Sequence, residues 1–147
     1  MRQFKFNMDE TRRLEILKPY LREDMILGRR GGKYDAMYFK GLDVTALQTL
    51  VHEKFACPDD TQNSAPCIKE FLEFMKKYPF MKAHGYIITP DRDDYRVSIE
   101  GVEGSYKEIP TSKTPEDVLK FNEDFTAMFR HADEFEIGKG HFYCWYD

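Results

Sequence analysis

Hydrophobic residues recur at intervals of three and four in four stretches of the chain, a spacing typical of helices with one buried face. We expect Asn7 to cap the first helix, and Pro19 to end it near Lys18. The other three helices are expected to begin at Asp43, Pro66 and Thr114. The second should end near Ala56, where a loop without periodicity, residues 57–65, leads to the third.

Alternating apolar and polar residues predict strands between these helices. Phe4 and Phe6 alternate with polar residues and predict a short strand before the first helix. Three further pairs of strand-like segments flank short turns, namely 25–27 with 33–39, 83–89 with 95–102, and 133–137 with 141–146.

The second of these turns sets a strand register. If residues 90–93 form a four-residue turn, Thr89 pairs with Asp94. His84 then lies beside Ile99 and leans toward the core.

Together these elements predict an α+β fold, a single domain over residues 1–147, with a mainly antiparallel sheet built from hairpins and covered by about four helices. The chain has 147 residues, of which 41% are hydrophobic, and a net charge of -4, so it can form one core and is not expected to be disordered. No apolar run reaches the roughly 20 residues that a membrane span needs.

The cysteines and the first residues indicate a compartment. Cys57, Cys67 and Cys144 are odd in number and widely spaced, which suits reduced thiols better than disulfides. The first 13 residues are rich in charge and lack the apolar stretch of a signal peptide. We therefore expect a cytoplasmic protein.

The charge is divided unevenly along the chain. Residues 1–40 carry 10 Lys and Arg against 6 Asp and Glu, whereas residues 41–147 carry 12 against 20. The acidic majority argues against nucleic-acid binding and suits a basic protein partner. The alternative is that a mixed charged surface serves only solubility.

The last hairpin carries the strongest functional pattern. A two-residue turn places Phe135, Ile137, Phe142 and Cys144 on one face. The other face then carries Glu134, Glu136, His141, Tyr143 and Trp145. Trp and Tyr dominate binding hot spots, so this row predicts a partner-binding surface. The alternative is that a helix covers the row, and the exposure of Trp145 distinguishes the two.

We therefore expect non-catalytic protein recognition, by an adaptor or by an inhibitor of the immunity-protein kind. No motif fixes a reaction, and the sequence predicts neither a metal nor a cofactor. The cysteine and histidine spacings do not match a zinc site, because Cys57 and Cys67 are separated by nine residues.

Two alternatives remain open. A small enzyme or ligand binder would have a pocket lined by His84, Tyr86, Cys67 and His52. Cys67 would be its best candidate for a reactive thiol, because it lies at the start of a helix, although no base stands beside it in the sequence.

The second alternative is weak anion binding by the glycine-rich turn at residues 28–32. Its side chains would be Arg29, Arg30 and Lys33, which could contact a phosphate or a nucleic acid.

Overall fold

The structure of the chain is a computed structural model that describes residues 4–30, 33–109, 114–138 and 140–147, without the side chains of Arg29, Arg30, Lys33 and Tyr106. The helices are α1 (Glu10–Leu17), α2 (Val44–His52), α3 (Ile68–Lys77) and α4 (Pro115–Phe129), with a 3-10 turn η1 (Tyr106–Glu108). The strands are β1 (Leu21–Arg30), β2 (Lys33–Leu42), β3 (Lys82–Ile88), β4 (Val97–Ser105), β5 (Glu134–Gly138) and β6 (His141–Trp145).

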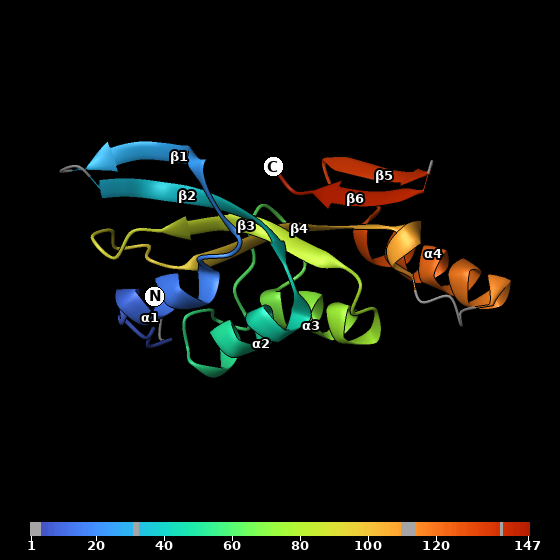
Figure 1. Cartoon of the computed structure of the whole chain (residues 1–147), viewed down its shortest axis with the longest axis horizontal. Helices are drawn as coiled ribbons and strands as arrows, with labels where there is room; N and C mark the ends of the chain where they lie inside the picture. The colour runs from blue at the N-terminus through green and yellow to red at the C-terminus, as the bar shows by residue number, and fades with distance from the viewer. Residues whose placement is uncertain (1–3, 31–32, 110–113, 139) are drawn as a thin grey trace.

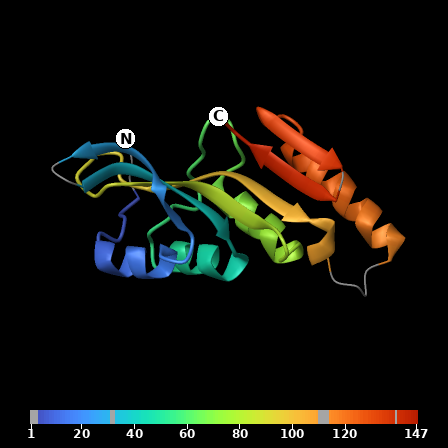
Figure 2. The same cartoon turned by 45° about the horizontal axis from the view of Figure 1, so that its top comes forward.

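The six strands form one antiparallel sheet in the order β1-β2-β3-β4-β6-β5. The four helices lie on one side of this sheet, as Figures 1 and 2 show. The core lies between the two layers and includes Phe39, Ile87 and Ile99 from strands and Phe71 and Phe129 from helices. This arrangement confirms the predicted α+β fold with an antiparallel sheet.

Two predicted helix starts are confirmed. The Asp43 carboxylate accepts a hydrogen bond from the Ala46 amide at the start of α2. The Thr114 hydroxyl accepts one from the Asp117 amide at the start of α4, and Pro115 occupies the first helical position.

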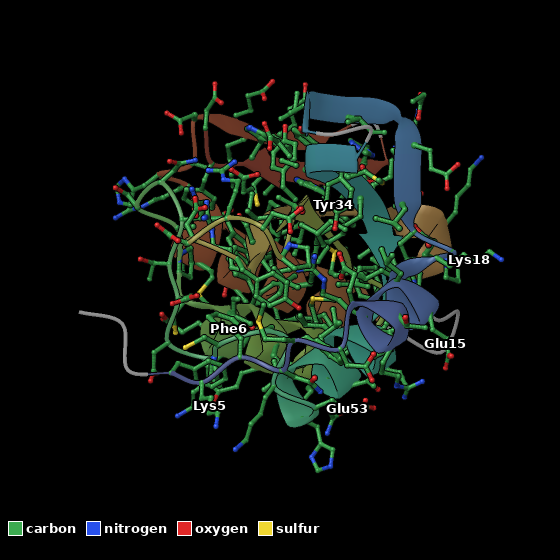
Figure 3. All side chains as sticks on the ribbon, turned by 90° about the vertical axis from the view of Figure 1, so that its left-hand side faces the viewer. Lys5, Phe6, Glu15, Lys18, Tyr34 and Glu53 are labelled. Atoms are coloured by element: carbon green, nitrogen blue, oxygen red, sulfur yellow. The ribbon has the colours of Figure 1, made fainter. Side chains whose placement is uncertain are left out.

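The start of α1 was predicted two residues too early. Asp9, and not Asn7, is the cap, and its carboxylate accepts from the Arg12 amide. Asn7 instead attaches the chain to the end of α2, because its amide group donates to the Glu53 carbonyl oxygen. The predicted strand at Phe4 and Phe6 is wrong, since residues 4–9 pair with no strand (Figure 3).

The end of α2 also lies earlier than predicted, at His52. Lys54 adopts a left-handed conformation with φ of 66°. Its amide donates to the Val51 carbonyl, and the Phe55 amide donates to that of Leu50. These two bonds form a Schellman motif, which ends a helix. At α3, Cys67 is the cap and Pro66 precedes it, so this helix begins two residues after the predicted proline.

The predicted register between β3 and β4 is wrong by one residue next to the turn and by two residues at His84, which pairs with Gly101 and not with Ile99. Tyr86 pairs with Ser98 and Gly85 with Ile99, because the connection between the strands is longer than a four-residue turn. A shift of one residue moves every side chain of a strand to the other face of the sheet. Tyr86 therefore lies on the face opposite the helices, and His84, two positions away on the same strand, shares that face and does not point toward the core.

The last hairpin has the predicted register. Phe135 pairs with Cys144 and Glu136 with Tyr143. Phe142 and Cys144 are buried in the core, so their neighbours along β6 face the other way. The hairpin joins the sheet through β6, where Tyr143 pairs with Glu103 of β4.

Candidate functional site

The candidate site lies on the sheet face opposite the helices, which we call the open face. Among the described residues no helix lies on it (Figure 2). Its middle carries five aromatic or imidazole rings from three strands, which we call the open-face cluster: Tyr38, His84, Tyr86, Tyr143 and Trp145.

The rings of the open-face cluster are in direct contact. The Trp145 ring centroid lies 5.7 Å from that of Tyr38 and 6.1 Å from that of Tyr86, and the two tyrosine rings lie 5.5 Å apart. His84 lies nearly parallel to Trp145 at 5.0 Å and to Tyr143 at 5.4 Å. All but His84 are half-buried, so the cluster presents ring surface to solvent.

A glycine allows His84 to reach across the sheet. His84 belongs to β3 and pairs with Gly101 of β4, yet its Nε2 donates to the Cys144 carbonyl of β6 over 3.0 Å. A Cβ at Gly101 would lie 2.3 Å from this Nε2 and 2.0 Å from the Cys144 oxygen. The imidazole therefore occupies the space above a residue without a side chain.

His84 is neutral at physiological pH. It is 0% exposed, and burial lowers its pKa to about 4. Because Nε2 carries the proton given to Cys144, Nδ1 is left as an acceptor, and it has no hydrogen-bond partner among the described residues.

Glu100 and Ser98 add two further buried polar groups beside the cluster. Glu100 is 5% exposed and sits at the bulge where the pairing of β4 with β3 shifts. Its Oε1 accepts from the Asn63 amide group over 3.1 Å. Neither Glu100 Oε2 nor Ser98 Oγ has a hydrogen-bond partner within the part of the chain that the structure describes. Such groups are uncommon among the buried polar atoms of folded proteins.

Burial raises the pKa of Glu100 to about 7, with Arg96 opposing and Asp147 adding to the shift. A carboxyl whose pKa is higher in the folded than in the unfolded state stabilises the fold only while protonated. The contribution of Glu100 is therefore full below about pH 4.5 and is lost as the pH rises through about 7. We expect the free energy of unfolding to fall by about 3 kcal/mol between these limits from this residue alone.

Urea unfolding at a series of pH values tests this expectation. Glu100→Gln should flatten the pH dependence of the free energy of unfolding over this range. The control is Glu123→Gln, since Glu123 is an exposed carboxylate on α4 and its loss should leave the dependence as in the wild type. If the free energy of unfolding of Glu100→Gln falls with pH as steeply as that of the wild type, the raised pKa assigned to Glu100 is contradicted.

Carboxylates surround the β6 side of the cluster. The pKa of Tyr143 is raised to about 12, first by burial and then by the charges of Glu134, Glu103 and Glu136. Glu103 also faces Lys40, whose Nζ lies 3.8 Å from its Oε1. The cluster is thus an aromatic surface beside several acidic groups.

All five hairpin residues predicted from the sequence share the open face. Glu134, Glu136 and His141 are exposed, whereas Tyr143 and Trp145 are half-buried. The sequence interpretation missed Tyr38, Glu100 and Glu103, which come from other strands. Tyr38 pairs with Tyr86 across β2 and β3, and the alternation along β2 could have indicated its face if the partner strand had been known.

The four residues of the pocket interpretation are divided between two regions. His84 and Tyr86 lie on the open face, whereas His52 is exposed at the end of α2 and Cys67 caps α3. Burial raises the pKa of Cys67, which disfavours its thiolate. A cavity of about 200 Å³ between α3 and α4 is lined by other residues, including Tyr78 and Phe121.

The side chains predicted to bind an anion lie outside the described part of the chain. Arg29 and Arg30 end β1 and Lys33 begins β2, which confirms a hairpin at this turn. The side chains of all three, and the whole of residues 31 and 32, lie outside the description.

Among the described residues, no three side chains of His, Cys, Asp or Glu come together as a metal-binding group. No helix within the described ranges is long and apolar enough to cross a membrane. In comparisons with known proteins, no protein family, no curated protein and no solved structure matches the chain significantly.

Proposed function

We propose that this chain is a non-catalytic recognition domain that binds a basic protein through the open face of its sheet. The observation that carries the proposal is the open-face cluster itself, a group of partly exposed aromatic rings on a face where the described residues place no helix. Contiguous exposed aromatic surface on a folded domain is typical of interaction sites.

The charges near the cluster support a basic partner. Glu134 and Glu136 are exposed on the edge strand, and their charges act on Tyr143. Opposite charge on a partner would steer the encounter and fix the orientation of the complex. A cytoplasmic location fits the proposal, since the three cysteines are free thiols.

Affinity capture from a native lysate, followed by measurement of the dissociation constant with the purified partner, tests the proposal. The variant replaces Tyr143 and Trp145 together by alanine, and the control is Leu119→Ala, because Leu119 is an exposed apolar residue on α4. We expect binding about 100-fold weaker or more in the double variant and unchanged in the control.

Thermal unfolding of both variants must accompany the binding measurement, because Tyr143 and Trp145 also stack on His84. A folded double variant that binds the partner as the wild type does would contradict the proposal. So would a partner whose binding does not weaken with added salt, since the proposed partner is basic.

A further inference from the structure

We propose that the partner adds a strand to the outer edge of β5, with basic side chains on the open face and apolar side chains on the opposite face. This proposal rests on the recognition function above and names the conformation and the side-chain pattern of the segment that is recognised. In such strand addition, main-chain hydrogen bonds supply affinity and alternate side chains supply specificity.

β5 is the outermost strand at one end of the sheet, and among the described strands it pairs only with β6 (Figure 1). Its register with β6 is unbroken from Glu134 to Gly138. The strand at the other end, β1, has an irregular register between Leu21 and Ile26. Such irregularities hinder the addition of another strand, so β5 is the better template of the two.

The main-chain groups of β6 are divided between its two neighbours. In an antiparallel sheet, alternate residues of a strand direct N–H and C=O toward opposite sides. The Cys144 carbonyl points toward β4, because it lies 2.0 Å from a Cβ built at Gly101. The main-chain groups of Tyr143 and Trp145 therefore point toward β5.

The same alternation assigns the main-chain groups of β5. Glu134 and Glu136 lie opposite Trp145 and Tyr143, so their N–H and C=O groups are used by β6. Those of Phe135 and Ile137 point outward, where the described residues place no further strand. The outer edge of β5 therefore offers two donors and two acceptors to an added strand.

The apolar side chains of β5 are incompletely covered. Phe135 and Ile137 face the helix side of the sheet, as do Phe142 and Cys144 on β6. Phe142 and Cys144 are 0% exposed, whereas Phe135 and Ile137 are only half-buried. The core thus ends at β5 with apolar surface that the apolar side chains of an added strand would cover.

A hollow of about 480 Å³ lies beside this strand, a size within the roughly 300–1,000 Å³ of ligand-binding clefts. It is lined by Phe135, Glu136, Ile137, Gly138 and His141. Glu136 faces away from the helices, whereas Phe135 and Ile137 face toward them. A hollow that residues of both faces line lies at the rim of the hairpin, where an added strand would enter.

The charges of β5 select a basic strand. Glu134 and Glu136 are exposed on the open face, and the exposed Asp133 precedes them. Side chains directly opposite each other on paired strands interact, and opposite charges stabilise the pair. Lysine or arginine at every second position of the partner segment would therefore lie across from the two glutamates.

Titration with short peptides tests the proposal. The probe is acetyl-Lys-Val-Lys-Val-Lys-amide. One control has both valines N-methylated, which keeps the side chains but removes two main-chain donors, and the other has glutamate in place of lysine. Two-dimensional NMR of the labelled full chain would follow the amides of Phe135 and Ile137. We expect these amides to shift and to exchange more slowly with solvent, with a dissociation constant on the order of millimolar. Both controls should bind at least about tenfold more weakly.

Ile137→Pro removes one outward N–H of β5, a change that an edge strand tolerates. The matched control is Ile137→Ala, which also shortens the side chain but keeps the N–H. We expect Ile137→Pro to bind the lysine peptide at least about tenfold more weakly than Ile137→Ala. Thermal unfolding shows whether both variants fold, and the N-methylated peptide provides the same test on the wild type.

Equal binding of the N-methylated peptide, or shifts that leave the amides of Phe135 and Ile137 unchanged, would overturn the proposal. So would a dimer of the free protein that Ile137→Pro dissociates, because a second copy would then occupy the edge.

The two proposals fail in different ways. A protein partner that requires Tyr143 and Trp145 but binds Ile137→Pro as tightly as Ile137→Ala would overturn strand addition and leave the recognition function standing. A partner insensitive to the Tyr143 and Trp145 double variant would overturn the recognition function itself.

Discussion

Gly101→Ala is expected to lower the free energy of unfolding by about 3 kcal/mol or more, the upper range for forcing one extra carbon into a packed site. The new Cβ would lie 2.0 Å from the Cys144 carbonyl oxygen and 2.3 Å from His84 Nε2. Rotation of a side chain cannot relieve the first contact, because the Cys144 oxygen is backbone. The strands β4 and β6 would have to separate, and His84 would lose its place in the open-face cluster.

Urea unfolding followed by the fluorescence of Trp145 measures this loss. The comparison variant is Gly41→Ala, because no atom lies within 4 Å of a Cβ built there, although its φ of 74° disfavours a side chain. We expect Gly41→Ala to cost about 1 kcal/mol from backbone strain alone. Equal losses of unfolding free energy in the two variants would contradict the prediction, because they would show that a Cβ at Gly101 meets no more crowding than one at Gly41.

Arg13→Met is expected to destabilise the fold by about 3 kcal/mol, because it removes the buried partner of an ion pair and the donor to buried carbonyls. Arg13 is fully buried, and its Nε and Nη2 donate to the two Glu10 carboxylate oxygens at 2.7 Å and 3.0 Å. The same guanidinium donates to the backbone carbonyls of Ile88 and Arg96. A methionine would fill the space but remove these bonds, and only Glu10 Oε2 would keep a donor, the Tyr34 hydroxyl at 2.6 Å.

Arg13 also joins α1 to the sheet through two aromatic residues. Its Nη2 donates to the Tyr34 hydroxyl over 2.9 Å, and its guanidinium carbon lies 4.3 Å from the centre of the Tyr95 ring. Tyr34 belongs to β2, and Figure 3 shows it above α1. The expected loss therefore includes the attachment of a whole helix, and α1 should exchange its amide hydrogens faster in the variant.

The neighbouring arginine provides the control for this prediction. Arg12 forms ion pairs with Glu15 and Glu53, but it lies at the surface. Exposed pairs contribute about 0–1 kcal/mol, so Arg12→Met should change the free energy of unfolding little. The two variants remove the same charge from adjacent positions of one helix, and similar losses would contradict the assigned role of Arg13.

Local patterns predicted the elements whose signals lie within a few residues. The sequence predicts Asp43 and Thr114 as caps, and this prediction needs only a local signal because a cap side chain bonds the amide three residues away. The last hairpin was placed correctly because parity alone decides which residues share a face across a two-residue turn. These parts of the fold depend on few long-range contacts.

The errors come from contacts between distant parts of the chain. Asn7 has a good cap sequence, but the carbonyl of Glu53, 46 positions away, takes its side chain. The pairing of β3 with β4 starts one residue away from the predicted register, because the connection between the strands is longer than a four-residue turn, and it shifts by one more residue at the Glu100 bulge. No local pattern indicates that Arg13 is buried, because Tyr95 and Ile88, which contact its guanidinium, lie far away along the chain.

The candidate site was predicted in part for the same reason. The row on the last hairpin could be read from one segment, whereas His84 enters the site only because Gly101 on another strand lacks a side chain. A sequence pattern cannot show that three strands converge in the order β3-β4-β6.

The position of β5 at the edge of the sheet gives its two glutamates a second consequence. An edge strand offers unpaired backbone groups to which a strand of another molecule can add, and charged side chains on the edge oppose this addition. Glu134 and Glu136 are exposed on that strand, so their charges oppose edge-to-edge association and also belong to the proposed binding surface. Replacing both by neutral residues would therefore alter the solubility of the protein together with its affinity.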